Sequence, residues 1–115
     1  MKPRFKVKES YSHLMAKIVL AHWVGGIMEE PFYIEDQYLF IPDVTVKENE
    51  SLVSIYEIVE SHAFTGKKLG LIQEWCYRNA TDLTVFEISA RYILAQTDKP
   101  DCIIPMDCYI IEFEK

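Results

Sequence analysis

Cysteine is scarce in this 115-residue sequence, which contains only Cys76, Cys102 and Cys108. An odd number of cysteines with no C-x-x-C spacing argues against both a disulfide framework and a zinc site. Reduced thiols are typical of the interior of the cell, so we expect a cytoplasmic protein.

Long apolar runs are missing as well. The most apolar stretch, 14–28, is interrupted by Lys17, His22 and the Gly25-Gly26 pair, so we expect no membrane-spanning helix and no membrane partner. The sequence also lacks the G-x-G-x-x-G, Walker and G-x-S-x-G motifs. It therefore offers no motif for nucleotide, flavin or acyl chemistry.

Positive charge is in the minority, because 12 Lys and Arg stand against 18 Asp and Glu, for a formal net charge of −6. A nucleic-acid-binding protein usually has a basic face. Four basic residues nevertheless lie within the first eight positions, and Lys67 and Lys68 form a second pair. Since the attraction of phosphate depends on the local field, this basic arm is compatible with DNA or RNA. It is equally compatible with a solvated tail.

Apolar material, in contrast, is plentiful. Half of the residues are hydrophobic and 13% are aromatic, and a chain of this length buries about two thirds of its unfolded surface. We therefore expect one domain over 1–115. It would consist of a basic N-terminal arm (1–8), a core (9–95) and a C-terminal loop with an edge strand (96–115).

The first regular element is predicted to be an amphipathic helix over Ser10–Val24. Ser10 or Ser12 can cap its N-terminus, and Gly25-Gly26 ends it. Apolar residues at helical spacing predict the face that packs against the protein: Leu14, Met15, Ile18, Val19 and Ala21.

The rest of the chain alternates between strand and helix patterns. The predicted elements are strands over 31–34, 38–46 and 52–60, a helix over 65–78, a strand over 83–88, a short helix over 89–95 and an edge strand over 108–113. A helical crossover joins parallel strands, so 52–60 and 83–88 should be parallel. The expected fold class is α/β (α+β), with a single mixed β-sheet flanked by helices.

Asp43 and Glu57 both stand inside predicted strands, where a carboxylate is out of place unless it is paired, solvated or bound to a metal. With a turn near Asn49, Asp43 falls opposite Tyr56 or Glu57. Two adjacent carboxylates repel each other, and a Mg²⁺ or Mn²⁺ ion would remove that cost. The alternative is that Pro42-Asp43 merely ends a strand and that Glu57 is solvated.

The order of these motifs resembles a known superfamily. Pro42-Asp43, then Glu57-x-Val59 in a strand–turn–strand, followed by a helix and a strand, resembles the PD-(D/E)XK nucleases. The stretch from Glu57 to His62 and the opening Glu9-Ser10-x-x-His13-x-x-x-Lys17 are most similar to the competence protein CoiA-like branch. The resemblance covers about residues 9–95 and implies a restriction-endonuclease-like αβββαβ core.

This resemblance implies metal-dependent hydrolysis of phosphodiester bonds, with DNA as the expected partner. Asp43 and Glu57 would bind Mg²⁺ or Mn²⁺, and Glu9 could supply a further metal ligand. The family's lysine belongs two residues after the glutamate, where this chain has Val59. Lys67 or Lys68 could reach the site and replace it; both are also readable as solvated lysines at a helix end.

Three more residues are candidates for contacts with substrate. Gln73-x-x-x-Tyr77 matches a pattern of RecB-type nucleases, and the spacing of four puts both side chains on one helical face. His62 could bind phosphate or carry a proton. Each also has a plain structural interpretation, Tyr77 as a packed aromatic and His62 as a loop residue. Two other functions stay open: an inactive relative that binds nucleic acid or protein, and a homodimer formed through the last strand.

Overall fold

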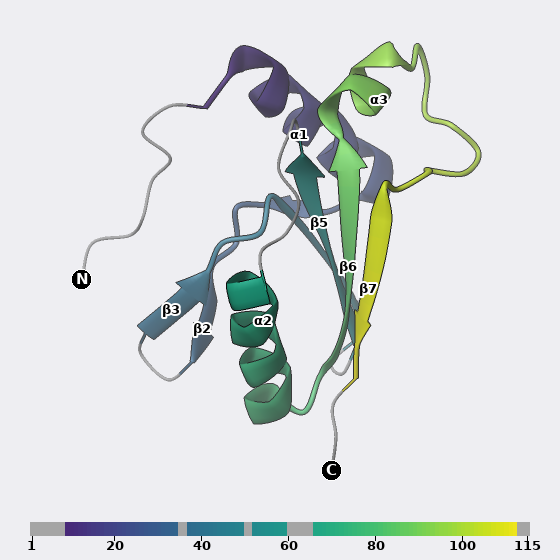
Figure 1. The fold of residues 1–115 in the computed structure, drawn as a ribbon. Helices are drawn as coiled ribbons and strands as arrows, with labels where there is room; N and C mark the ends of the chain where they lie inside the picture. The colour runs from purple at the N-terminus through teal and green to yellow at the C-terminus, as the bar shows by residue number, and fades with distance from the viewer. Residues whose placement is uncertain (1–8, 35–36, 50–51, 60–65, 113–115) are drawn as a thin grey trace.

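The fold is built on one mixed five-stranded sheet with helices on both faces (Figure 1). In this computed structural model, residues 9–34, 37–49, 52–59 and 66–112 are described. The strands lie in the order β1-β4-β5-β6-β7, with the bounds β1 Ile27–Met28, β4 Val44–Asn49, β5 Leu52–Val59, β6 Asp82–Ser89 and β7 Asp107–Ile111. The helices are α1 Tyr11–Val24, α2 Gly66–Asn79 and α3 Ala90–Ala95. The mixed α+β class predicted from the sequence is confirmed.

The connections follow from the chain order. β5 and β6 pair in parallel through all eight residues, from Leu52↔Asp82 to Val59↔Ser89, as the helical crossover of α2 requires. The other neighbours pair antiparallel. β7 is the last strand in the order, as predicted, so pairing of two chains through this strand remains a prediction for light scattering to test.

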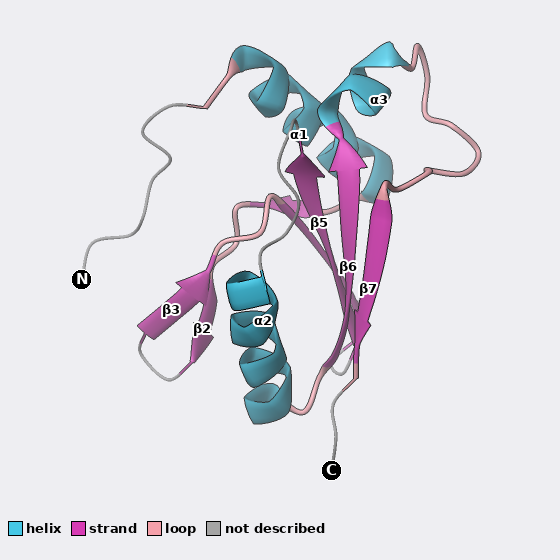
Figure 2. Ribbon diagram, in the orientation of Figure 1, coloured by secondary structure: helices cyan, strands magenta, loops and turns pink. Residues whose placement is uncertain are grey.

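α1 and α3 lie over one face of the sheet and α2 over the other (Figure 2), and each face carries an apolar cluster. On the first face, α1 and α3 pack against the sheet through residues that include Leu20, Trp23 and Ile93. On the other face, α2 contributes Ile72 and Cys76 to a second cluster. Alternate residues of β5 and β6 point to opposite faces, so each strand contributes side chains to both clusters.

The packed face of α1 differs from the predicted one. Leu14 and Ile18 are 40% and 43% exposed, whereas Ala16, Leu20 and Trp23 are buried. The caps were predicted well: Ser10 Oγ accepts a hydrogen bond from the His13 backbone N–H at 3.1 Å, and Gly25 ends the helix with φ 66°. The prediction was wrong for Leu14 and Ile18, whereas Val19 and Ala21 do pack against the buried cluster. It failed in part because α1 carries apolar residues around most of its circumference. Contacts with β4 and α3 then decide which of them are buried.

The predicted strand over 38–46 is in fact two strands in two sheets. β3 (Gln37–Phe40) pairs with β2 (Phe32–Ile34) in a separate two-stranded sheet, and β4 begins only at Val44. Pro42 lies between them and has no N–H to donate to a ladder, which explains the break. The predicted strand over 31–34 therefore lies outside the main sheet, where the short strand β1 takes the place beside β4.

Candidate functional site

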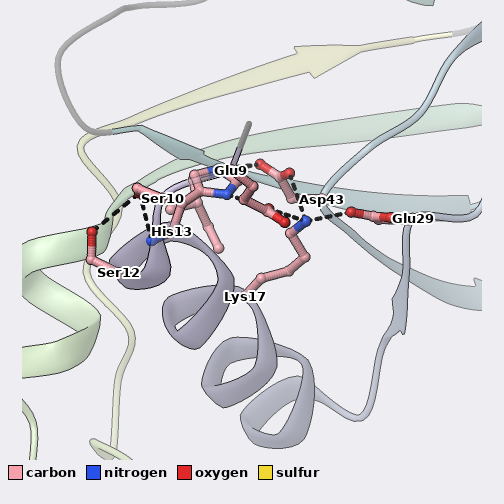
Figure 3. A network of polar contacts seen from close by, with 8 residues as sticks. Glu9, Ser10, Ser12, His13, Lys17, Glu29 and Asp43 are labelled. Carbon is pink, nitrogen blue, oxygen red and sulfur yellow. Dashed lines mark hydrogen bonds and ion pairs between the residues drawn. The ribbon is translucent and has the colours of Figure 1, made fainter. Parts of the chain in front are cut away.

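Lys17 is the centre of a polar cluster between α1 and the ends of β1 and β4 (Figure 3). Its side chain is 1% exposed, although it is charged. The ammonium group Nζ contacts carboxylates from three parts of the chain: Glu29 at 2.5 Å, Glu9, and Asp43 at 3.9 Å. A buried ammonium ion is stable only with such partners.

Asp43 lies in the turn that leads into β4 and is 2% exposed. Its Oδ2 atom accepts a hydrogen bond from the backbone N–H of Ile58 at 2.9 Å and lies 3.5 Å from His13 Nε2. Its Oδ1 atom faces Lys17. The carboxylate therefore joins α1, the start of β4 and the end of β5.

His13 connects two of the acids. Its Nδ1 atom lies 2.6 Å from Glu9 Oε1, and its Nε2 atom faces Asp43. Glu9, His13 and Lys17 are spaced by four residues, which places their side chains along one side of the helix and the turn before it. This spacing is the reason that all three reach Asp43's end of the sheet (Figure 3).

Each charged group in this cluster stabilises the charged form of its partner. Burial disfavours the charged forms, but hydrogen bonds from Lys17 and His13 outweigh it and lower the pKa of Glu9. Burial likewise opposes the charge on Lys17, and the hydrogen bonds to Glu29 and Glu9, with the nearby Asp43 charge, raise its pKa. At neutral pH the cluster thus holds the ammonium ion of Lys17 against the ionised carboxylate of Glu9.

Glycine at position 26 allows β1 to come close enough for this arrangement. A Cβ atom at Gly26 would lie 2.5 Å from Val44 Cγ1 and 2.9 Å from the Thr45 carbonyl oxygen. Just beyond, the Glu29 backbone N–H donates to the Asp43 carbonyl oxygen at 3.2 Å. The pairing of β1 with β4 therefore carries Glu29 to the cluster.

Glu57, the second predicted acid, is 8% exposed on the face of β5 that also carries Val53 and Ile55. Its neighbour in the parallel register is Glu87 on β6, also buried. Glu87 Oε1 accepts a hydrogen bond from the Tyr109 hydroxyl at 2.8 Å. Glu87 was not among the predicted site residues, although it lies in the predicted strand over 83–88.

The other predicted site residues are placed elsewhere or lie outside the description. Gln73 and Tyr77 line a groove on α2 with Glu112, just after β7. His62 lies outside the described residues, as does the basic arm 1–8, and of Lys67 and Lys68 only the backbone, in the first turn of α2, is described.

The predicted metal ligands suit Mg²⁺ in their chemistry, since all are carboxylates. The Asp43 carboxylate, however, already contacts Lys17, His13 and the Ile58 N–H. Within the described ranges, no group of three or more His, Cys, Asp or Glu side chains could hold a metal ion. Magnesium at Asp43, Glu57 and Glu9 therefore remains a prediction from the sequence.

Comparison with protein-family models, curated proteins and solved structures gave no match. No helix within the described part of the chain is long and apolar enough to cross a membrane.

Lys17 and His13 were not among the predicted site residues. They entered only through the resemblance of the opening Glu9-Ser10-x-x-His13-x-x-x-Lys17. The spacing of four was a usable signal for a shared helical face, and a lysine within an otherwise apolar stretch was another. The contact with Asp43, 26 positions beyond Lys17, could not be read from either signal.

Proposed function

We propose that this chain is a nuclease-like domain that hydrolyses phosphodiester bonds in nucleic acid at the cluster around Asp43. The observation that supports it is the meeting of an acid, a histidine with a carboxylate partner and a lysine within one cluster. Such a group can accept a proton and orient a water molecule at His13, whose side chain is 14% exposed, while the buried Lys17 adds positive charge to the same cluster. The PD-(D/E)XK-like order of motifs in the sequence supports the same reaction class.

The roles follow from the contacts. Glu9 contacts Nδ1 of His13 and so orients the ring, which leaves Nε2 directed toward Asp43. In hydrolysis, the water oxygen would attack phosphorus and its proton would pass to Nε2 of His13. The bond from phosphorus to the leaving oxygen would break, and that oxygen would leave as a hydroxyl group with the proton that His13 gives up. Lys17 supplies the lysine that Val59 cannot, but from α1 instead of β5.

A cleavage assay on labelled single-stranded and double-stranded DNA tests the proposal, with Mg²⁺, with Mn²⁺ and with a chelator. We expect cleavage by the wild-type chain and a loss of roughly 10²–10⁴-fold for His13→Ala, the usual effect of removing a proton acceptor. His22→Ala is the matched control, because His22 lies exposed on the same helix. Equal rates for the two variants would contradict the role of His13.

A second candidate is a nuclease-derived domain that binds nucleic acid or a protein without cutting. The engagement of both Asp43 oxygens by protein groups favours it. The same assay separates the two, because this domain would shift labelled DNA in a gel and leave it intact under all three conditions.

A further inference from the structure

Three carboxylates from separate parts of the chain surround one point in this fold, and that point is occupied by Lys17 Nζ. Glu9 precedes α1, Glu29 follows β1 and Asp43 precedes β4. Each has an oxygen within ion-pair distance of the ammonium group. Carboxylates gathered in this way would repel one another without a cation among them.

We propose that Lys17 is the resident cation of this acidic cluster and excludes divalent ions from it. The proposal goes beyond the proposed function, because it concerns the charge balance of the cluster whether or not nucleic acid is cut there.

Asp43 and Lys17 carry opposite charges and are both buried. Asp43 and Lys17 are 2% and 1% exposed, so neither can exchange its partner for water without a rearrangement. A divalent ion bound to Asp43 would have to displace the ammonium group. The displaced ammonium ion would then remain buried without its counter-charges, which is strongly unfavourable.

The distances from Lys17 Nζ to the carboxylate oxygens also suit an ammonium group better than a magnesium ion. Nζ lies 3.9 Å from Asp43 Oδ1 and 2.5 Å from Glu29 Oε1, whereas Mg²⁺ holds each oxygen ligand at about 2.0–2.1 Å in an octahedron. The remaining oxygen of Asp43 accepts from the Ile58 N–H. With Lys17 in place the acids are thus spaced around an ammonium group, and a smaller divalent ion would require them to close in on the space that this group now fills.

Replacement of Lys17 by an uncharged side chain of similar length should convert the cluster into a divalent-cation site. We expect Mn²⁺, titrated by calorimetry in the absence of nucleic acid, to bind Lys17→Met at least tenfold more tightly than the wild-type chain. Asp43→Asn in the Lys17→Met background should abolish that gain. Lys47→Met is the matched control, because Lys47 forms an exposed ion pair with Glu30 at 3.0 Å, and it should behave as the wild type.

A folded Lys17→Met variant with no gain in Mn²⁺ affinity would overturn the proposal. Binding of Mn²⁺ to the wild-type chain that Asp43→Asn abolishes would overturn it as well. If Lys17→Met does not fold, NMR spectroscopy of the ¹⁵N-labelled wild-type protein tests the proposal through the ammonium resonance of Lys17. It should persist with equimolar Mn²⁺, and its disappearance through paramagnetic broadening would refute the assignment. None of these readouts depends on cleavage, so failure here is distinguishable from failure of the proposed function.

Discussion

The carboxylate of Asp43 accepts a hydrogen bond from the backbone N–H of Ile58, with 2.9 Å between Oδ2 and the nitrogen. Antiparallel pairing of β4 with β5 runs from Asn49↔Leu52 to Val44↔Tyr56. The side chain of Asp43 therefore satisfies a backbone donor two residues beyond the last paired position. It extends the attachment of β4 to β5 after the ladder itself has ended.

This bond predicts different costs for two substitutions of Asp43. Asp43→Ala removes the acceptor of the Ile58 N–H and leaves the Lys17 ammonium short of a counter-charge, so we expect a loss of about 3–5 kcal/mol in the free energy of unfolding. Asp43→Asn keeps an oxygen that can accept from Ile58 and should lose less. Urea denaturation followed by circular dichroism measures both. Equal losses would show that the hydrogen bond to Ile58 contributes nothing beyond the charge.

The cluster also predicts how stability changes with pH. The pKa of Glu9 is lowered by folding, so its contribution is present above its usual value of 4.5 and is lost as the pH falls through the lower folded pKa. The pKa of Lys17 is raised, so its contribution is present below 10.5 and is lost as the pH rises through the higher folded value.

Urea midpoints measured across pH test this pair of effects. Glu9→Gln should flatten the acid limb of the stability curve below pH 4.5, the usual pKa of this carboxyl group. Asp98→Asn, a substitution of an exposed acid, should leave that limb unchanged. An acid limb identical in the wild type and Glu9→Gln would contradict the pairing of Glu9 with Lys17 and His13.

Two glycines should respond oppositely to the same substitution. At Gly26 a new Cβ atom would lie 2.5 Å from Val44 Cγ1, so Gly26→Ala should cost about 1–3 kcal/mol, as overpacking does. At Gly70, inside α2, a Cβ atom would meet nothing within 4 Å. Gly70→Ala should instead be neutral or stabilise by up to about 1 kcal/mol, through helix propensity. Thermal unfolding monitored by circular dichroism distinguishes the two substitutions. An unchanged melting temperature for Gly26→Ala would contradict the close packing of β1 on β4.

The three cysteines should differ in reactivity. Burial, with a smaller contribution from the charge of Asp82, raises the pKa of Cys76 to about 12, so its thiolate is scarce at neutral pH. Cys102 and Cys108 are exposed. Labelling of the native chain with a thiol reagent at pH 7.5 should therefore be rapid at Cys102 and Cys108, and Cys76 should react only after unfolding. Mass spectrometry of the digested protein assigns each label, and rapid native labelling of Cys76 would contradict its place in the core.

Local signals in the sequence were sufficient for most elements and their ends. Ser10 and Gly25 set the limits of α1 because a hydroxyl can accept from an orphan N–H and a glycine can adopt a positive φ without strain. The apolar patterns of β5 and β6, with a helix between them, fixed their parallel pairing, since a crossover of that kind has one favourable geometry.

Only the tertiary structure decided which side chains meet. The sequence marked Asp43 as an unusual acid, but its partners Lys17 and His13 come from a helix whose apolar residues allow more than one packed face. The break at Pro42, which separates β3 from β4, and the approach of β1 that carries Glu29 likewise depend on contacts between distant segments. The sequence by itself determined the helices, the parallel pairing of β5 with β6 and the unusual position of the acid Asp43. The balance of charge around that acid was set by tertiary packing, because a buried ion is stable only where its partners are brought within a few ångströms of it.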